Sequence, residues 1–100
     1  MLHIINSSPA QTSALRSCLL RLMPDSALLL IENGVYAAIK SDDNSEIWTG
    51  LPDNVKLYVL ESDLDARGIS ADEIDARFTS TDYSGFVDLV ERYPAVQSWV

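Results

Sequence analysis

The sequence has 100 residues, which is the length of one domain and enough for a single hydrophobic core. Fifteen acidic residues against seven basic ones give a net charge of −8, and the basic residues do not gather in one stretch. A negatively charged surface does not bind the phosphate backbone, so the composition argues against direct binding of nucleic acid. The single cysteine excludes an internal disulfide and a multi-cysteine metal site.

The hydropathy pattern argues against two further classes of protein. The N-terminal stretch has neither the basic start nor the long apolar segment of a signal peptide. No stretch approaches the roughly 20 apolar residues that a membrane-spanning helix needs. We therefore expect a cytoplasmic protein with no membrane association. We also expect no metal, nucleotide or redox cofactor, because the sequence has no glycine-rich phosphate loop and no cluster of metal ligands.

The chain begins with a predicted strand and helix. Residues 2–5 form a short apolar run, and the turn-forming residues 6–9 end it. Thr12 or Ser13 is suited to cap the following helix, because its hydroxyl can accept from the unpaired backbone N–H groups there. The helix should turn one apolar stripe toward a sheet, formed by Leu15, Leu19 and Leu22.

An unbroken apolar run at residues 27–31 is the centre of the predicted fold. A strand without polar alternation must be covered on both faces, which indicates a parallel sheet between helices. The run stops at Glu32, Asn33 and Gly34, and residues 35–39 then read as a short helix. Ligands collect at the carboxyl ends of parallel strands, where this polar turn lies. We expect Gly34 to take a backbone conformation that a Cβ would oppose.

The middle of the chain is predicted to be a loop, a return to the core and a strand. Residues 40–46 are polar and acidic, but their spacing does not match a calcium loop, so we expect a solvated loop. Ile47 and Trp48 should bring the chain back to the core or to a subunit interface. Residues 55–60 form the next predicted strand.

The last third continues the alternation of helices and strands. A helical turn is predicted at residues 61–67 and should end at Gly68, and Ser70 with Glu73 has the form of a capping box. Residues 77–81 are a weak strand signal. Asp82 should cap a final helix, whose apolar stripe comprises Phe86, Leu89, Val90 and Tyr93. Trp99 is expected to dock on the domain or on a neighbouring protein.

These elements predict an α/β fold with a mainly parallel sheet of about four to five strands. Helices should cover both faces, which makes a single three-layer αβα domain spanning residues 1–100. His3 lies in the first strand among apolar neighbours, and we interpret it as structural, because no second ligand accompanies it. The acidic pairs Asp63 with Asp65 and Asp72 with Glu73 could act in acid–base chemistry, but capping and surface roles explain them better.

Four parts of the sequence together resemble the DsrH/TusB family of sulfur-relay subunits, in order and over essentially the whole chain. The parts are Leu2-His3 with residues 6–9, residues 28–38, residues 57–60 through 63–68, and residues 82–89 followed by Gln97-Ser98-Trp99. The resemblance implies a DsrEFH-like fold and a role in a complex. Family members join DsrE/TusD-like and DsrF/TusC-like sister subunits in a dimer of heterotrimers that passes persulfide sulfur between cysteines.

The resemblance leaves two pathways open. In the transfer-RNA branch, sulfur comes from a small donor protein and leaves to a carrier protein, in support of 2-thiolation of wobble uridine. The other branch serves dissimilatory sulfur oxidation. In both, the principal cysteine belongs to the DsrE/TusD-like subunit, so this chain is expected to be a non-catalytic subunit of a sulfurtransferase complex, with the transfer-RNA branch as the first interpretation.

Cys18 is the candidate site residue, and it has two interpretations. Some sulfur-oxidation members carry a cysteine at the matching point of the first helix, which implies a sulfur acceptor and a sulfurtransferase in its own right. Arg21 lies three residues along on the same side and would favour the reactive thiolate. However, Cys18 flanks the apolar stripe and lacks the help of a helix N-terminus, so it is also suited to be a small buried hydrophobic residue.

Overall fold

Five parallel strands form one sheet in the computed structural model, which describes residues 1–99 but not the side chains of residues 42–44. The order of the strands is β4-β3-β2-β1-β5, and every neighbouring pair is parallel. Their bounds are β1 Leu2–Ile5, β2 Ala27–Leu30, β3 Lys56–Leu60, β4 Phe78–Thr81 and β5 Val96–Trp99. The predicted parallel α/β sheet is confirmed.

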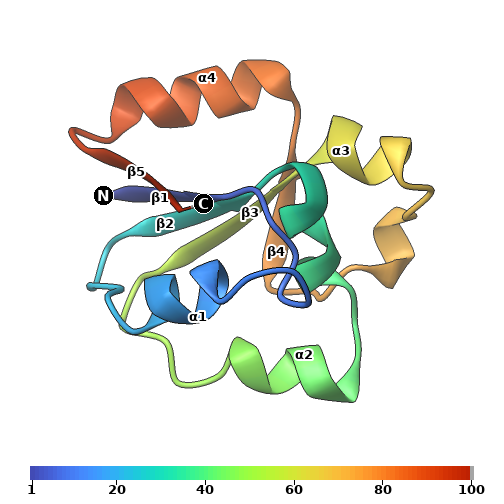
Figure 1. The fold of residues 1–100 in the computed structure, drawn as a ribbon. Coiled ribbons are helices and arrows are strands. Elements are labelled where there is room, and N and C mark those ends of the chain that lie inside the picture. The colour runs from blue at the N-terminus through green and yellow to red at the C-terminus, as the bar shows by residue number, and fades with distance from the viewer. Residues whose placement is uncertain (100) are drawn as a thin grey trace.

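Helices lie on both sides of this sheet (Figure 1). In the view of Figure 1, α4 covers one face, and α1 and α2 lie on the other. The α-helices are α1 Ala14–Leu19, α2 Asp42–Ile47, α3 Glu61–Ala66 and α4 Tyr83–Arg92, and the 3₁₀ helices are η1 Glu32–Ala38 and η2 Ala71–Glu73. No helix in the part of the chain that the structure describes is both long and apolar enough to span a membrane.

Alternate residues of the strands point into two hydrophobic clusters, one on each face. All four residues of β2 are buried, so the unbroken apolar run is the centre of the sheet as predicted. The larger cluster gathers under α1, α2, α3 and η1, and includes Ile5, Leu28, Leu30, Val59 and Phe78. The smaller cluster gathers under α4, and includes Leu2, Ile4, Ala27, Leu29 and Leu89.

The turn after β2 differs in detail from the prediction. The helix there is a 3₁₀ helix and begins at Glu32, three residues before the predicted start. Glu32, not Gly34, has the left-handed backbone, with φ of 50°. A Cβ at Gly34 would instead overlap the carbonyl oxygen of Ile5 and lie 3.0 Å from the carbonyl carbon. Glycine is needed here for close approach of η1 to the end of β1, because a side chain has no room.

One prediction from local sequence is wrong, and one strand was not predicted. Residues 40–46 are not a loop, because α2 begins at Asp42. The anchor of α2 is Trp48, directly after its last residue: Trp48 is 2% exposed, donates from Nε1 to the Ala37 carbonyl at 3.1 Å, and meets Phe78 edge-on. The C-terminal residues were expected to dock, but not to form a strand. They add β5 to the sheet edge, with Ile5 opposite Trp99.

The predicted helix boundaries are largely confirmed. Asp82 accepts from the Gly85 N–H at 2.8 Å and caps α4. Gly68 follows α3 with φ of 66°. Ser70 and Glu73 form the capping box, although it starts a single 3₁₀ turn.

Candidate functional site

Cys18 lies inside the core, not at its border. Its residue surface is 0% exposed, and Leu15 and Leu22 are buried with it, whereas Leu19 is only partly buried. Cys18 is therefore a central member of the apolar stripe, which corrects the predicted position beside it. Burial raises the pKa of the Cys18 thiol from its ordinary 9.0 to about 12. The thiol is thus protonated at neutral pH, and a protonated thiol is a poor nucleophile.

Arg21 does not supply the activation that its spacing predicts. Its guanidinium lies over the indole of Trp99, 5.7 Å from the ring centroid, and Nη1 donates weakly to the Ser17 carbonyl at 3.4 Å. Desolvation alone accounts for the shifted pKa of Cys18. The arginine thus makes an aromatic contact between the turn after α1 and β5.

His3 joins the same contact from β1. The residue is 4% exposed, and its Nδ1 accepts a hydrogen bond from Nε1 of Trp99 at 3.0 Å. Burial, together with the positive charge of the nearby N-terminal amine, lowers the pKa of His3 below 6.5. His3 is therefore neutral at pH 7, with its proton on Nε2, because Nδ1 must be free to accept. The expected docking of Trp99 is confirmed.

A polar network connects the carboxyl ends of β2 and β3. The Glu32 N–H donates to Oδ2 of Asp63 at 2.6 Å, which holds the left-handed backbone of Glu32 in place. Nε and Nη2 of Arg67 donate to Oδ1 of Asn33 at 3.0 and 2.9 Å. Arg67 also lies 3.8 Å from the Asp63 carboxylate. Because these groups bond to one another, the network orients the loops after both strands.

Three of the four candidate acid–base residues, Asp63, Asp72 and Glu73, are held by such local bonds. Asp63 belongs to the network just described. Hydrogen bonds with Ser70 lower the pKa of Asp72 and of Glu73, because they favour the ionised carboxylates. A general acid or base near neutral pH needs a shift in the opposite direction.

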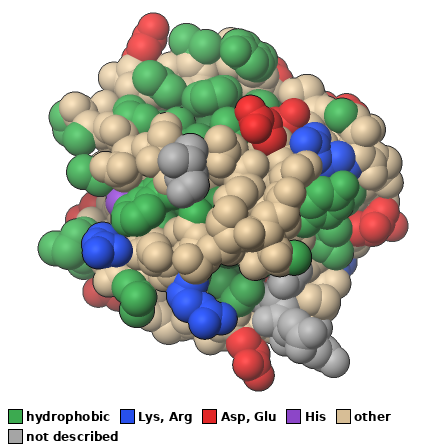
Figure 2. All heavy atoms as spheres, viewed as in Figure 1, with side chains coloured by type: hydrophobic (Ala, Val, Ile, Leu, Met, Phe, Trp, Pro, Cys, Tyr) green, Lys and Arg blue, Asp and Glu red, His purple; other side chains and the backbone are tan. Residues whose placement is uncertain are grey.

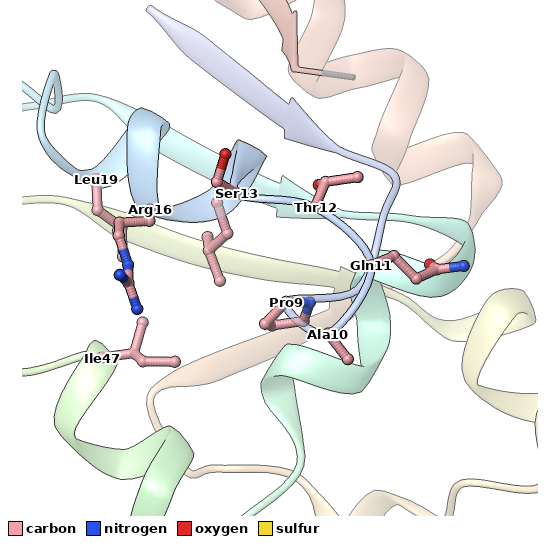
Figure 3. Close-up of a pocket in the computed structure, with 9 residues that line it drawn as sticks. Pro9, Ala10, Gln11, Thr12, Ser13, Arg16, Leu19 and Ile47 are labelled. Carbon is pink, nitrogen blue, oxygen red and sulfur yellow. The ribbon is translucent and has the colours of Figure 1, made fainter.

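An open cleft of about 590 Å³ lies between α1 and α2 (Figure 3). Arg16 and Leu19 of α1 face Ile47 of α2 across it, and Pro9 and Ala10 close one end. This α1–α2 cleft is lined by aliphatic side chains, hydroxyls and the Arg16 guanidinium, with no cysteine and no carboxylate among the residues that line it. It offers a binding surface without a thiol or a carboxylate.

Sequence reasoning missed two of these groupings. The Asn33–Arg67 and Glu32–Asp63 contacts could have been anticipated, because both partners follow parallel strands whose carboxyl ends lie at one edge. The His3–Trp99–Arg21 cluster depends on β5, and the sequence carries little strand signal there.

Comparison with known proteins gives a consistent result. The family described as "DsrH like protein" matches residues 7–96. "Protein TusB" of Enterobacter sp. strain 638 is 37% identical over 100 residues, which cover 99% of this chain and all of that protein. "Protein TusB" of Escherichia coli K12 is 35% identical, with the same coverage.

Solved structures show the same fold at lower identity. The crystal structure of the ychN protein of E. coli matches with a TM-score of 0.74 and 18% identity, over 98% of this chain and 97% of that one. The solution structure of Tm0979 from Thermotoga maritima matches with a TM-score of 0.66 and 23% identity, over 92% and 93% of the two chains. At these identities the likeness concerns the fold alone.

Proposed function

Because the chain belongs to the DsrH family, we propose that it is a supporting subunit of a sulfur-relay complex that promotes 2-thiolation of wobble uridine in transfer RNA. The observation that carries this proposal is the full-length similarity to TusB proteins. The relay passes persulfide sulfur, and the principal cysteine lies on a sister subunit. We propose residues 1–100 as one DsrH/TusB-like domain that works in the cytoplasm.

Cys18 then has an architectural role. Sulfur transfer needs direct contact between a thiolate and the sulfur that it attacks. The thiol of Cys18 meets neither requirement in this structure, because it is fully buried and its pKa is raised to about 12. A sulfurtransferase that uses Cys18 itself would require α1 to move away from the sheet.

The partners in this proposal are DsrE/TusD-like and DsrF/TusC-like subunits, assembled as a dimer of heterotrimers, with donor and carrier proteins acting through the complex. An exposed apolar stripe on α4 supports such assembly: Tyr83, Val87 and Val90 are 68%, 45% and 39% exposed. Figure 2 shows hydrophobic side chains gathered along the α4 side of the molecule. Contiguous apolar surface of this kind is typical of protein interfaces.

Quantifying 2-thiouridine in bulk transfer RNA tests both parts of the proposal. A strain that lacks this gene should lose most of the modified nucleoside, and the unaltered gene should restore it. A gene encoding Cys18→Ala should restore it equally well. Normal 2-thiouridine in the deletion strain would refute the transfer-RNA role and favour the sulfur-oxidation branch, in which related proteins also occur. Loss with Cys18→Ala in a fully assembled complex would show that this subunit carries sulfur.

A further inference from the structure

A second cleft lies on the other side of α1, between this helix and strands β1 and β5. It is about 710 Å³ in volume and open to solvent. Its lining includes His3, Ser17, Arg21, Gln97 and Trp99. We call it the α1–β5 cleft. Nothing in the proposed relay function uses it.

The charge of this cleft differs from that of the molecule. The chain carries a net charge of −8, yet no Asp or Glu is among the residues that line the cleft, and Arg21 is the charged side chain there. Arg21 forms no ion pair with any residue whose side chain is described. Among the described residues its only hydrogen bond is the weak one to the Ser17 carbonyl, so most of its N–H donors are available.

His3 provides a second, independent indication that the cleft binds a ligand. Its Nδ1 accepts from Trp99, which places the proton on Nε2. Within the described residues this Nε2–H has no acceptor, although His3 is 96% buried, being 4% exposed. In the described structure, every polar side-chain atom that is fully enclosed has a hydrogen-bond partner. Nε2 of His3 has none, so it is not fully enclosed and must face the cleft that His3 lines.

One ring, the indole of Trp99, contacts both donors. The indole of Trp99 stacks against the guanidinium of Arg21 and donates to His3. A guanidinium stacked in this way loses less freedom when it binds a ligand. An anion with several oxygens can accept from the guanidinium, from the imidazole N–H and from the hydroxyl of Ser17.

We propose that the α1–β5 cleft binds a small oxyanion, either a free inorganic one or the carboxylate of a small organic molecule. No carboxylate side chain lines the cleft to oppose a negative charge, and its side-chain donors are a guanidinium, an imidazole N–H, an amide and hydroxyls. The apolar side chains of Met23 and Pro24 at the rim leave room for an organic part.

NMR of the full-length protein tests this inference. The chain has two tryptophans, so its ¹⁵N spectrum has two indole signals. Sulfate, phosphate and acetate are titrated separately, with chloride at matched ionic strength as the reference. The Trp99 signal should shift and saturate with at least one of the three, and the comparison between them distinguishes inorganic oxyanions from carboxylates. The Trp48 signal should stay in place, because its indole N–H is bonded to Ala37 in the core.

Two charge-matched variants decide whether the cleft is responsible. Arg21→Gln should weaken binding about tenfold, which is the effect of losing one charge-assisted contact. Arg16→Gln removes the same charge from α1, on the side of the α1–α2 cleft, whereas Arg21 lies in the turn after α1. This variant should leave the affinity within about twofold of the original. Unchanged indole signals from Trp48 show that the variants are folded. Shifts that do not saturate, that chloride reproduces, or that both variants weaken equally would overturn the proposal.

Discussion

Gly34 is the position at which the smallest possible side chain should cost the most. A Cβ there would overlap the carbonyl oxygen of Ile5 and lie 3.0 Å from its carbonyl carbon. Both atoms are backbone at the end of β1, so no side-chain rotation relieves the clash. The same carbonyl accepts the hydrogen bond from the Ile31 N–H at 2.9 Å, so a shift of β1 weakens the contact with β2 as well.

The expected loss of stability for Gly34→Ala follows from these contacts. Overpacking of a rigid site costs about 1–3 kcal/mol, and loss of a backbone hydrogen bond adds about 0.5–1.5 kcal/mol. We therefore expect a total of about 2–4 kcal/mol. In a domain of this size, each kcal/mol lowers the melting temperature by about 4–8 °C. The variant should thus melt roughly 10–30 °C below the parent protein.

Circular dichroism melts of three variants separate the possible causes. In Gly85→Ala the new Cβ meets mainly the hydroxyl of Thr81, a side-chain group that can rotate away, so the loss should be small. Gly50→Ala meets nothing within 4 Å but has φ of 70°, so it should cost about 1 kcal/mol through the backbone alone. A melting temperature for Gly34→Ala equal to that of Gly85→Ala would refute the close approach of η1 to β1.

Three further predictions concern His3, Cys18 and Arg67. The pKa of His3 is lowered in the folded state, so the unfolded state binds more protons and stability should fall as the pH drops below 6.5. His3→Gln keeps an acceptor for Trp99 and should make stability depend less on pH in melts between about pH 7.5 and 5.5. Cys18 has a raised pKa, so its contribution to stability is complete below pH 9.0 and is lost as the pH rises toward about 12. Because the thiol is buried, the native protein should react with a thiol reagent at least a hundredfold more slowly than the protein unfolded in urea. Arg67→Lys removes the paired contact with Asn33, and it should cost about 1–2 kcal/mol in urea unfolding even though the charge is kept.

Much of the sheet could be predicted, because most of its strands are apolar runs that can be recognised from the local sequence. The run at residues 27–31 indicated a strand covered on both faces, and β2 is buried along its whole length. Asp82, Ser70 and Gly68 marked helix ends because capping depends on a residue's own side chain or backbone.

The parts that could not be predicted depend on contacts between distant residues. α2 is polar, and its place is set by Trp48, which bonds to Ala37 and packs on Phe78. β5 has exposed residues along most of its length and forms because β1 offers an open edge. Cys18 shows the same limit at the candidate site. Its nearness to Arg21 in sequence suggested activation, but Trp99, from the far end of the chain, holds the guanidinium.

Assembly with sister subunits is the central claim, and co-purification measures it most directly. The tagged chain, co-expressed with the DsrE/TusD-like and DsrF/TusC-like proteins of the same genome, should elute from a size-exclusion column with both partners in equal amounts, at the mass of a dimer of heterotrimers. Val87→Glu, which places a charge in the apolar stripe of α4, should reduce this complex strongly, whereas Ser84→Glu, which adds the same charge at an exposed polar position of the helix, should leave it intact. A chain that is folded, monomeric and free of both partners would contradict the proposal.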